Sequence, residues 1–236
     1  MSKYDDYRSK HPRVTERYPA LAPVFSQLIG DQDRHFDLFR ALCGTNGPGA
    51  TTPLFQVDIV LLSVLNRSLD LIAGFTVSYD RWNLTMAAPA VRMQVDNVLR
   101  LALLLKAPPG SVTDLLLEGT PLNRARDPLA LPGEKYKLTD QRLRDHARDL
   151  FPWLDLVYEK SSGWVHFSSV HVAVTMEVTE DGRFLSRFPG DIDRYPVEFL
   201  EQVLWAMQQA TAGVLSVVDT FARDKSLAAA GWDNEE

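Results

Sequence analysis

Apolar residues recur at helical spacing over most of the chain. Two such patterns cover residues 15–28 and 36–42, and the Gly30-Asp31 pair between them predicts a break. The two longest patterns cover residues 54–79 and 84–106, are apolar on most sides, and are separated by a tight turn. Because long helices joined by a short connection pack antiparallel, these two predict a hairpin at the centre of a helical bundle.

In the second half of the chain the spacing of apolar residues changes from helical to alternating over one segment. Helices are predicted over residues 111–119, 139–152 and 153–166. Residues 171–188 then alternate around a Thr-Glu-Asp-Gly turn, which predicts a β-hairpin. The last pattern begins near Pro196 and is the cleanest amphipathic helix in the chain.

These patterns together predict a mainly α fold. We expect an up-and-down helical bundle of about four long helices plus short N-terminal helices, with one β-hairpin in the C-terminal half. Residues 14–224 are expected to form a single domain that includes this hairpin. Residues 1–13 and 225–236 are expected to be flexible tails.

The composition limits the binding partners and the cellular compartment that we expect for this protein. Its formal net charge of −6 is acidic, whereas proteins that capture nucleic acid broadly carry a basic excess. DNA is therefore not expected as a partner, although a small basic pocket is compatible with RNA. The single cysteine, Cys43, fits a reducing compartment. The first residues are polar, and apolar runs such as residues 99–105 are shorter than the ~20 residues that span a bilayer, so we expect a cytoplasmic protein without a membrane span.

Charged residues interrupt the second of the two longest helices at a regular spacing. Arg92, Asp96 and Arg100 stand four apart among Val, Met, Leu and Ala, so they share one arc of the helix and are expected to be partly buried. One interpretation is an internal ion-pair ladder that fixes helix packing, with Arg67 or Asp70 as the partner across the hairpin. The other is a polar pocket inside the bundle, where an arginine holds an anion or stabilises developing negative charge.

A second polar face lies in the stretch WLDLVYEKSSGWVHFSSVH at residues 153–171. Tyr158, Ser162 and His166 stand four apart and share one helix face, and His171 lies close behind them in the sequence. In a structural interpretation the hydroxyls are bonded near the helix end and the histidine orients a loop. In a chemical interpretation His166 is a general acid or base beside an arginine, which suits metal-independent cleavage of a phosphodiester by the ribose 2′-hydroxyl.

Neither a metal nor another cofactor is predicted. The chain has no HExxH motif, paired cysteines or carboxylate cluster beside its histidines, and residues 44–52 lack the Gly-Lys-Ser/Thr of a phosphate-binding loop. Residues 120–137 form a predicted exposed loop with clustered basic residues. The candidates for catalysis are His166, Arg92, Arg100, Tyr158 and Ser162. The candidates for substrate binding are Arg67, Asp96, Arg124, Arg126 and His171.

Residues 67–75, 88–104 and 151–171 resemble a group of uncharacterised bacterial helical proteins. That group shares a Tyr-x-x-x-Ser-Gly-x-x-His type signature after an arginine-bearing helical hairpin. The resemblance covers most of residues 54–222 and implies a helical bundle of bacterial origin.

A helical bundle with arginine and histidine at its polar centre is more distantly similar to the HEPN superfamily. Its members include RNases of toxin and phage-defence systems, which use an Arg-x(4 to 6)-His motif, usually across a dimer interface. Here the residue six before His166 is Lys160 rather than arginine. The resemblance therefore implies one of two alternatives: His166 works with Arg92 or Arg100 from another helix, or the bundle has no nuclease activity.

The resulting functional hypothesis is an effector of bacterial stress or phage defence that cleaves or binds RNA. If it is an enzyme, it is a metal-independent endoribonuclease. The alternative is a non-catalytic helical module that homodimerises or binds a partner protein. A small-molecule sensor with Tyr158 and Arg92 in its pocket is a third hypothesis.

Overall fold

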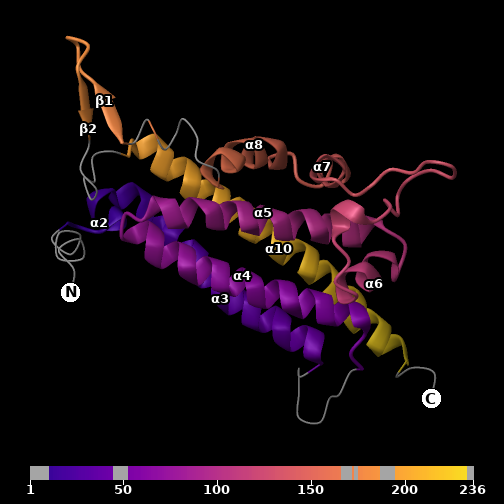
Figure 1. Ribbon diagram of the computed structural model, residues 1–236. Helices are drawn as coiled ribbons and strands as arrows, with labels where there is room; N and C mark the ends of the chain where they lie inside the picture. The colour runs from indigo at the N-terminus through magenta and orange to yellow at the C-terminus, as the bar shows by residue number, and fades with distance from the viewer. Residues whose placement is uncertain (1–10, 45–52, 166–171, 173–174, 187–194, 233–236) are drawn as a thin grey trace.

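The computed structural model describes residues 11–44, 53–165, 172, 175–186 and 195–232 of the 236-residue chain. Long helices form a bundle (Figure 1), and they are α3 (Ala22–Cys43), α4 (Gln56–Asp80), α5 (Leu84–Lys106) and α10 (Val197–Trp232). The mainly α bundle that the apolar pattern predicts is confirmed. The predicted central hairpin corresponds to α4 and α5.

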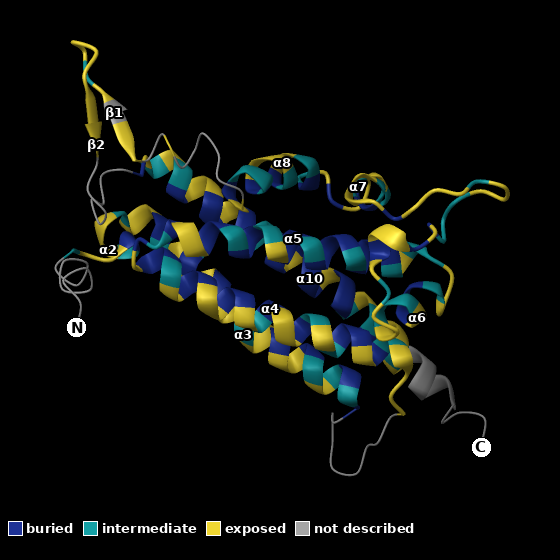
Figure 2. Cartoon of the chain, in the orientation of Figure 1, coloured by how far each residue is buried: buried dark blue, intermediate teal, exposed yellow. Residues whose placement is uncertain are grey.

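Helix α5 has the most neighbours in the bundle. It packs against α4 and α10, and α3 closes the bundle by packing against α4 and α10 as well. Its outward side supports α7 (Asp140–Ala147) and α8 (Leu154–Val165), which lie across it as an outer layer in Figure 1. Figure 2 shows that buried residues follow α5 along its length, whereas α8 buries only one side.

Short elements complete the fold, and they are α2 (Val14–Arg17), η1 (Pro19–Leu21), α6 (Ser111–Leu117) and η2 (Leu122–Arg124). Helix α7 begins at an N-cap, because the Thr139 hydroxyl accepts a hydrogen bond from the Arg142 backbone N–H at 3.4 Å. Helix α6 begins after Gly110, whose φ of +83° is a left-handed conformation that glycine adopts without strain.

The predicted break at Gly30-Asp31 is wrong, because α3 runs through both residues. A glycine inside a helix costs only about 1 kcal/mol relative to alanine. Leu28, His35 and Leu38 are buried on one side of this helix, and their packing outweighs that cost. Helix α10 continues to Trp232, so residues 225–232 of the expected C-terminal tail are helical.

The segment 120–137 is anchored rather than freely exposed. The Asp127 backbone N–H donates to the Tyr136 carbonyl at 2.8 Å, and the Leu138 N–H donates to the Ala125 carbonyl at 3.1 Å, so two arms of the segment pair. The Asp127 side chain is fully buried against α7. The expectation of an exposed loop is therefore wrong for its base, because a buried carboxylate with basic partners holds it down.

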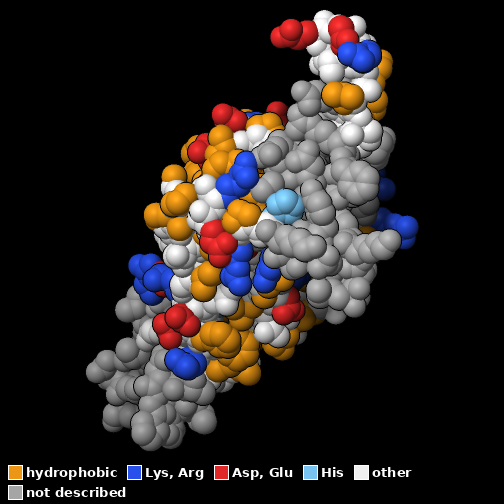
Figure 3. All heavy atoms as spheres, turned by 90° about the vertical axis from the view of Figure 1, so that its left-hand side faces the viewer, with side chains coloured by type: hydrophobic (Ala, Val, Ile, Leu, Met, Phe, Trp, Pro, Cys, Tyr) orange, Lys and Arg blue, Asp and Glu red, His pale blue; other side chains and the backbone are white. Residues whose placement is uncertain are grey.

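The predicted β-hairpin is confirmed, with β1 (Met176–Val178) antiparallel to β2 (Phe184–Ser186). Gly182 in the connecting turn has a φ of +78°. The hairpin projects from the bundle in Figure 1, and its tip, at the top of Figure 3, carries acidic and basic side chains. His171, at which the predicted hairpin begins, lies outside the described residues. The exposed apolar residues of the hairpin include Val178, Phe184 and Leu185.

A glycine allows α10 to approach α5 and the start of α8 closely. A Cβ atom at Gly213 would lie 3.2 Å from Val98 Cγ2 on α5 and 3.3 Å from Trp153 Cζ2, which is tighter than ordinary carbon contacts. Trp153 directly precedes α8. The small residue therefore helps to set the position of α8 over the bundle.

Within the described residues, α4 is the helix that is long and apolar enough to span a membrane, by length and composition alone. Its most apolar window has a mean hydropathy of 1.5, and 39% of that window is buried here. In the bundle α4 packs between α3 and α5. Its exposed side includes the apolar residues Ile59 and Val77 as well as Arg67 and Asp70.

Candidate functional site

Asp96 joins three arginines on the outward side of α5. Its carboxylate lies 3.7 Å from Arg92 Nη1 and 3.8 Å from Arg67 Nη2 on α4, and it forms a close ion pair with Arg100. The side chains of Arg92, Asp96 and Arg100 are 17%, 22% and 31% exposed. The predicted partial burial and the ion-pair ladder are therefore confirmed, with Arg67 rather than Asp70 as the partner across the hairpin.

Arg92 also contacts the outer layer. Its Nη2 lies 3.0 Å from Oδ2 of Asp140, the first residue of α7, and the Tyr158 hydroxyl on α8 donates to the same oxygen at 2.6 Å. The guanidinium carbon of Arg92 lies 4.1 Å from the centre of the Tyr158 ring, a cation–π distance. Burial raises the pKa of the Tyr158 hydroxyl, and its hydrogen bond to Asp140 raises it further. The phenol therefore stays protonated and acts as a donor.

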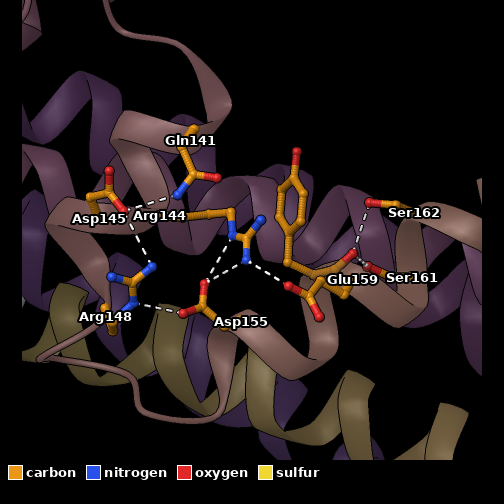
Figure 4. Close-up of polar contacts among 9 residues, drawn as sticks. Gln141, Arg144, Asp145, Arg148, Asp155, Glu159, Ser161 and Ser162 are labelled. Atoms are coloured by element: carbon orange, nitrogen blue, oxygen red, sulfur yellow. Dashed lines mark hydrogen bonds and ion pairs between the residues drawn. The ribbon is translucent and has the colours of Figure 1, made fainter.

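A second arginine, Arg144 of α7, also lies over Tyr158. Its guanidinium carbon is 4.7 Å from the ring centre, and the guanidinium is held by Asp155 at 2.8 Å and by Glu159 at 3.1 Å (Figure 4). Arg148 extends the ion pairs, because its Nε donates to Asp155 Oδ2 at 2.6 Å. Many of the charged residues predicted on this helix thus join α7 to α8 and hold Tyr158 in place.

An open pocket of about 410 Å³ lies between α5 and α8. We call it the α5/α8 pocket, and its lining consists of Pro89, Arg92, Met93, Asp96, Asp140, Tyr158, Ser162 and Val165. The Ser162 hydroxyl donates to the Tyr158 backbone carbonyl at 2.8 Å, so its oxygen is left to accept. Three of the candidate catalytic residues, Arg92, Tyr158 and Ser162, therefore share one pocket. Asp96, a candidate for substrate binding, also lines this pocket.

The remaining candidates fall elsewhere. Arg100 contacts Asp96 but lines a different pocket, together with Arg67. Arg124 and Arg126 are exposed, and within the part of the chain that the structure describes neither lines the α5/α8 pocket. The structure therefore does not bring these two arginines to the site. His166, which follows the pocket residue Val165 in the sequence, and His171 lie outside the described residues.

A buried hydrogen-bond chain leads from Arg67 into the core, and sequence reasoning missed it. Arg67 donates to Asn97 Oδ1, Asn97 Nδ2 donates to Gln94 Oε1 at 3.0 Å, and Gln94 Nε2 donates to Ser68 Oγ at 2.6 Å. Asn97, Gln94 and Ser68 are at most 1% exposed. The available signal was their polar character at positions of α4 and α5 that face the core.

His35 of α3 lies at the inner end of this chain. Its Nδ1 is 2.7 Å from the Asp31 carbonyl oxygen, and its Nε2 is 2.7 Å from Ser68 Oγ. A carbonyl oxygen only accepts, so Nδ1 carries the proton and Ser68 donates to Nε2. Burial lowers the pKa of His35, although the hydrogen bond to Asp31 opposes this shift. The neutral ring thus fits a chain in which every bond runs in one direction, from Arg67 to the Asp31 carbonyl.

No group of three or more His, Cys, Asp or Glu side chains among the described residues is placed to hold a metal ion. The polar groups of the site suit anion binding instead, through guanidiniums and a phenol hydroxyl.

Comparison of the chain with protein-family models, with curated proteins and with solved structures finds no match.

Proposed function

We propose that this protein is a bacterial effector that binds RNA and cleaves it without a metal, in stress or phage defence, and that it is distantly HEPN-like. The observation that carries the proposal is the α5/α8 pocket. There the Arg92 guanidinium and the Tyr158 hydroxyl point at one shared acceptor, the Asp140 carboxylate. Two donors that converge on one anionic oxygen can bind a phosphodiester oxygen in the same way.

Asp140 occupies the place that we assign to a phosphate. Its side chain is 57% exposed and stands at the start of α7, so it can turn into solvent, whereas Arg92 is only 17% exposed and stays in the pocket. A phosphate oxygen in its place would accept from the same two donors. Asp96 stays on the opposite side of Arg92 and keeps the guanidinium oriented.

Cleavage of this kind needs proton transfer and charge stabilisation. The ribose 2′-oxygen attacks the neighbouring phosphorus and the bond to the 5′-oxygen breaks, which yields a 2′,3′-cyclic phosphate and a free 5′-hydroxyl. One group must take the 2′-hydroxyl proton and one must protonate the 5′-oxygen. The Arg92 guanidinium can stabilise the negative charge that develops on the phosphorus-bound oxygens. The raised pKa of Tyr158 keeps its hydroxyl protonated, so it can donate a hydrogen bond to the same oxygens. His166, outside the described residues, is our candidate for proton transfer.

The test is incubation of the purified chain with fluorescent single-stranded RNA in EDTA. We expect cleavage by the unaltered protein and at least about a hundredfold loss in Arg92→Gln and in His166→Ala, in the range measured for such groups. Arg34→Gln is the matched control, because Arg34 is an ion-paired surface arginine on α3. RNA left intact by the unaltered protein, or cut equally by all four proteins, contradicts the proposed cleavage.

A second candidate function, a non-catalytic interaction module, is favoured by one observation. Exposed apolar side chains stand on both helices of the central hairpin, among them Ile59 and Val77 of α4 and Met86 and Met93 of α5. Such surfaces often serve protein association. Solution mass by light scattering distinguishes the two candidates when combined with the RNA assay, since a dimer that leaves RNA uncut and unbound is the result that this module requires.

A further inference from the structure

A second pocket lies on the other side of Asp96, between α4, α5 and α6. Its volume is about 210 Å³, and we call it the α4/α6 pocket. Its apolar lining consists of Val60, Val64, Leu101, Leu104, Leu116 and Leu117. Its polar lining includes two arginines, Arg67 from α4 and Arg100 from α5. The pocket is thus apolar over most of its wall and cationic at one edge.

The positive charge at this edge exceeds the negative charge available to it. Asp96 is the only carboxylate among the described residues that pairs with Arg67 or Arg100, and it also pairs with Arg92. Arg92 has Asp140 as a second carboxylate partner. Among the described residues the second partners of the other two arginines are neutral, because Arg67 donates to Asn97 Oδ1 and Arg100 donates to the Asp96 backbone carbonyl at 2.9 Å. Two guanidiniums therefore share part of one carboxylate at the pocket.

The two guanidiniums are also close enough to oppose each other. Burial lowers the pKa of Arg67, the charge of Asp96 opposes this shift, and the like charge of Arg100 adds to it. Like charges side by side favour an anion between them. The Arg67 and Arg100 side chains are 42% and 31% exposed, so a ligand entering from solvent can contact both.

We propose that the α4/α6 pocket binds a small amphipathic carboxylate, with its head group between Arg67 and Arg100 and its aliphatic chain against the leucines of α5 and α6. At about 30 Å³ for each water-sized group, the volume holds roughly seven such groups. A six-carbon carboxylate such as hexanoate has about that size. This site does not depend on the proposed RNA activity.

Each part of the ligand has a partner in the α4/α6 pocket. The carboxylate takes charge-assisted hydrogen bonds from guanidiniums that Asp96 satisfies only in part. The chain displaces water from the apolar wall, at about 0.8 kcal/mol per buried CH₂. The Ser63 hydroxyl donates to the Ile59 carbonyl at 2.7 Å, so it offers no donor to the head group. Recognition of the head group thus depends on the two arginines.

The first measurement is calorimetric titration of the full chain with hexanoate, acetate, hexan-1-ol and hexylammonium as probes. We expect saturable binding of one hexanoate per chain. Acetate lacks the chain, hexan-1-ol lacks the charge and hexylammonium reverses it, so each is expected to bind at least about tenfold more weakly. Equal binding of hexanoate and hexan-1-ol, or no binding of hexanoate, overturns the proposal.

Substitutions then locate the site. Arg67→Gln and Arg100→Gln are each expected to weaken hexanoate binding at least about tenfold. Leu117 is 44% exposed, so Leu117→Glu should keep the fold while its carboxylate repels the ligand to a similar extent. Arg34 does not line this pocket and pairs with Asp219, so Arg34→Gln should leave hexanoate binding unchanged. If circular dichroism shows all variants folded and hexanoate binds them equally, the ligand is not in this pocket and the proposal fails.

Discussion

The Arg92 guanidinium of α5 lies 4.1 Å from the ring centre of Tyr158 of α8, and both side chains contact the same oxygen of Asp140. One contact therefore links the central helix of the bundle to both helices of the outer layer. Arg144 lies over the same ring from α7, so the tyrosine is surrounded by charge on groups that are themselves ion-paired. This relationship makes Tyr158 a structural residue as well as a candidate for function.

Replacement of Tyr158 separates the contribution of its hydroxyl to stability from that of its ring. Tyr158→Phe keeps the ring and loses the hydrogen bond to Asp140, and we expect a cost of about 0.5–1.5 kcal/mol in the free energy of unfolding. Tyr158→Leu also loses the cation–π contact and is expected to cost about 0.5–1 kcal/mol more. Urea unfolding followed by circular dichroism measures both. In a double-mutant cycle with Arg92→Gln, a coupling energy of zero would show that the contact contributes nothing.

His35 makes the stability of the bundle depend on pH. Its folded pKa lies below the unfolded value of about 6.5, so the unfolded chain binds the proton first and stability falls as the pH drops below about 6.5. The full stability is present above that value. Protonation would also turn Nε2 from an acceptor into a donor and break its bond from Ser68. For one proton, the free energy of unfolding changes by at most about 1.4 kcal/mol per pH unit.

The matched variant for this effect is His35→Gln, which keeps a polar side chain but does not titrate. Urea unfolding of both proteins between pH 7.5 and pH 5 should show a steeper loss in the unaltered protein. The other histidines are common to both chains, so their contributions cancel in the comparison. Parallel slopes for the two proteins would contradict our assignment of the neutral, buried ring.

The fold was largely predictable because helical periodicity is a local signal. Leu61, Leu65 and Ile72 of α4 are fully buried, and their spacing is readable in the sequence alone. The wrong prediction of a break at Gly30 also follows from using a local signal. A glycine lowers local helix propensity by about 1 kcal/mol, whereas burying one leucine contributes about 1.5–3 kcal/mol that no local window contains.

The candidate site was predictable only in part. The spacing of Arg92 and Asp96 indicates a shared arc of α5, but the choice between Arg67 and Asp70 as the partner depends on the axial register of α4 against α5. These two alternatives differ by about one helical turn, or roughly 5 Å, and the apolar pattern does not determine the register that finely. His35 was missed for a related reason, since its side-chain partner Ser68 comes from α4, and Gln94, which donates to Ser68, comes from α5.

Asp127 is expected to be the anchor of residues 120–137. Its buried carboxylate accepts from Arg142 and His146 of α7 and from the Leu129 backbone N–H at 2.9 Å. Burial would raise its pKa, but these bonds outweigh burial and hold the pKa below its usual range. The carboxylate therefore contributes stability above about pH 4, and this contribution is lost as the pH falls through the folded pKa.

Asp127→Asn removes the charge while keeping the shape, and we expect a cost of about 2–3 kcal/mol at pH 7. Trypsin gives a local readout, because Arg124 and Arg126 are exposed in this segment and should be cut faster once it loosens. Asp149→Asn is the control, since Asp149 pairs with Lys106 on the surface and is 69% exposed. Unchanged proteolysis of Asp127→Asn would contradict the anchoring role.

Lys225 ties the C-terminal helix to the start of α4. Its Nζ lies 2.6 Å from Asp58 Oδ2 and donates to the Leu42 carbonyl, also at 2.6 Å, and the two charged side chains are only 8% and 3% exposed. Lys225→Met leaves the Asp58 carboxylate buried without its cation, so we expect a loss of about 3–5 kcal/mol in the free energy of unfolding. The double variant with Asp58→Asn should recover part of this loss, because the remaining amide is neutral and still accepts from the Phe55 backbone N–H. Arg223→Met, at a position 74% exposed on the same helix, should change stability by less than about 0.5 kcal/mol. Strictly additive effects of the two substitutions would mean that the pair does not act as a unit, and α10 would then be held to α4 by its apolar face alone.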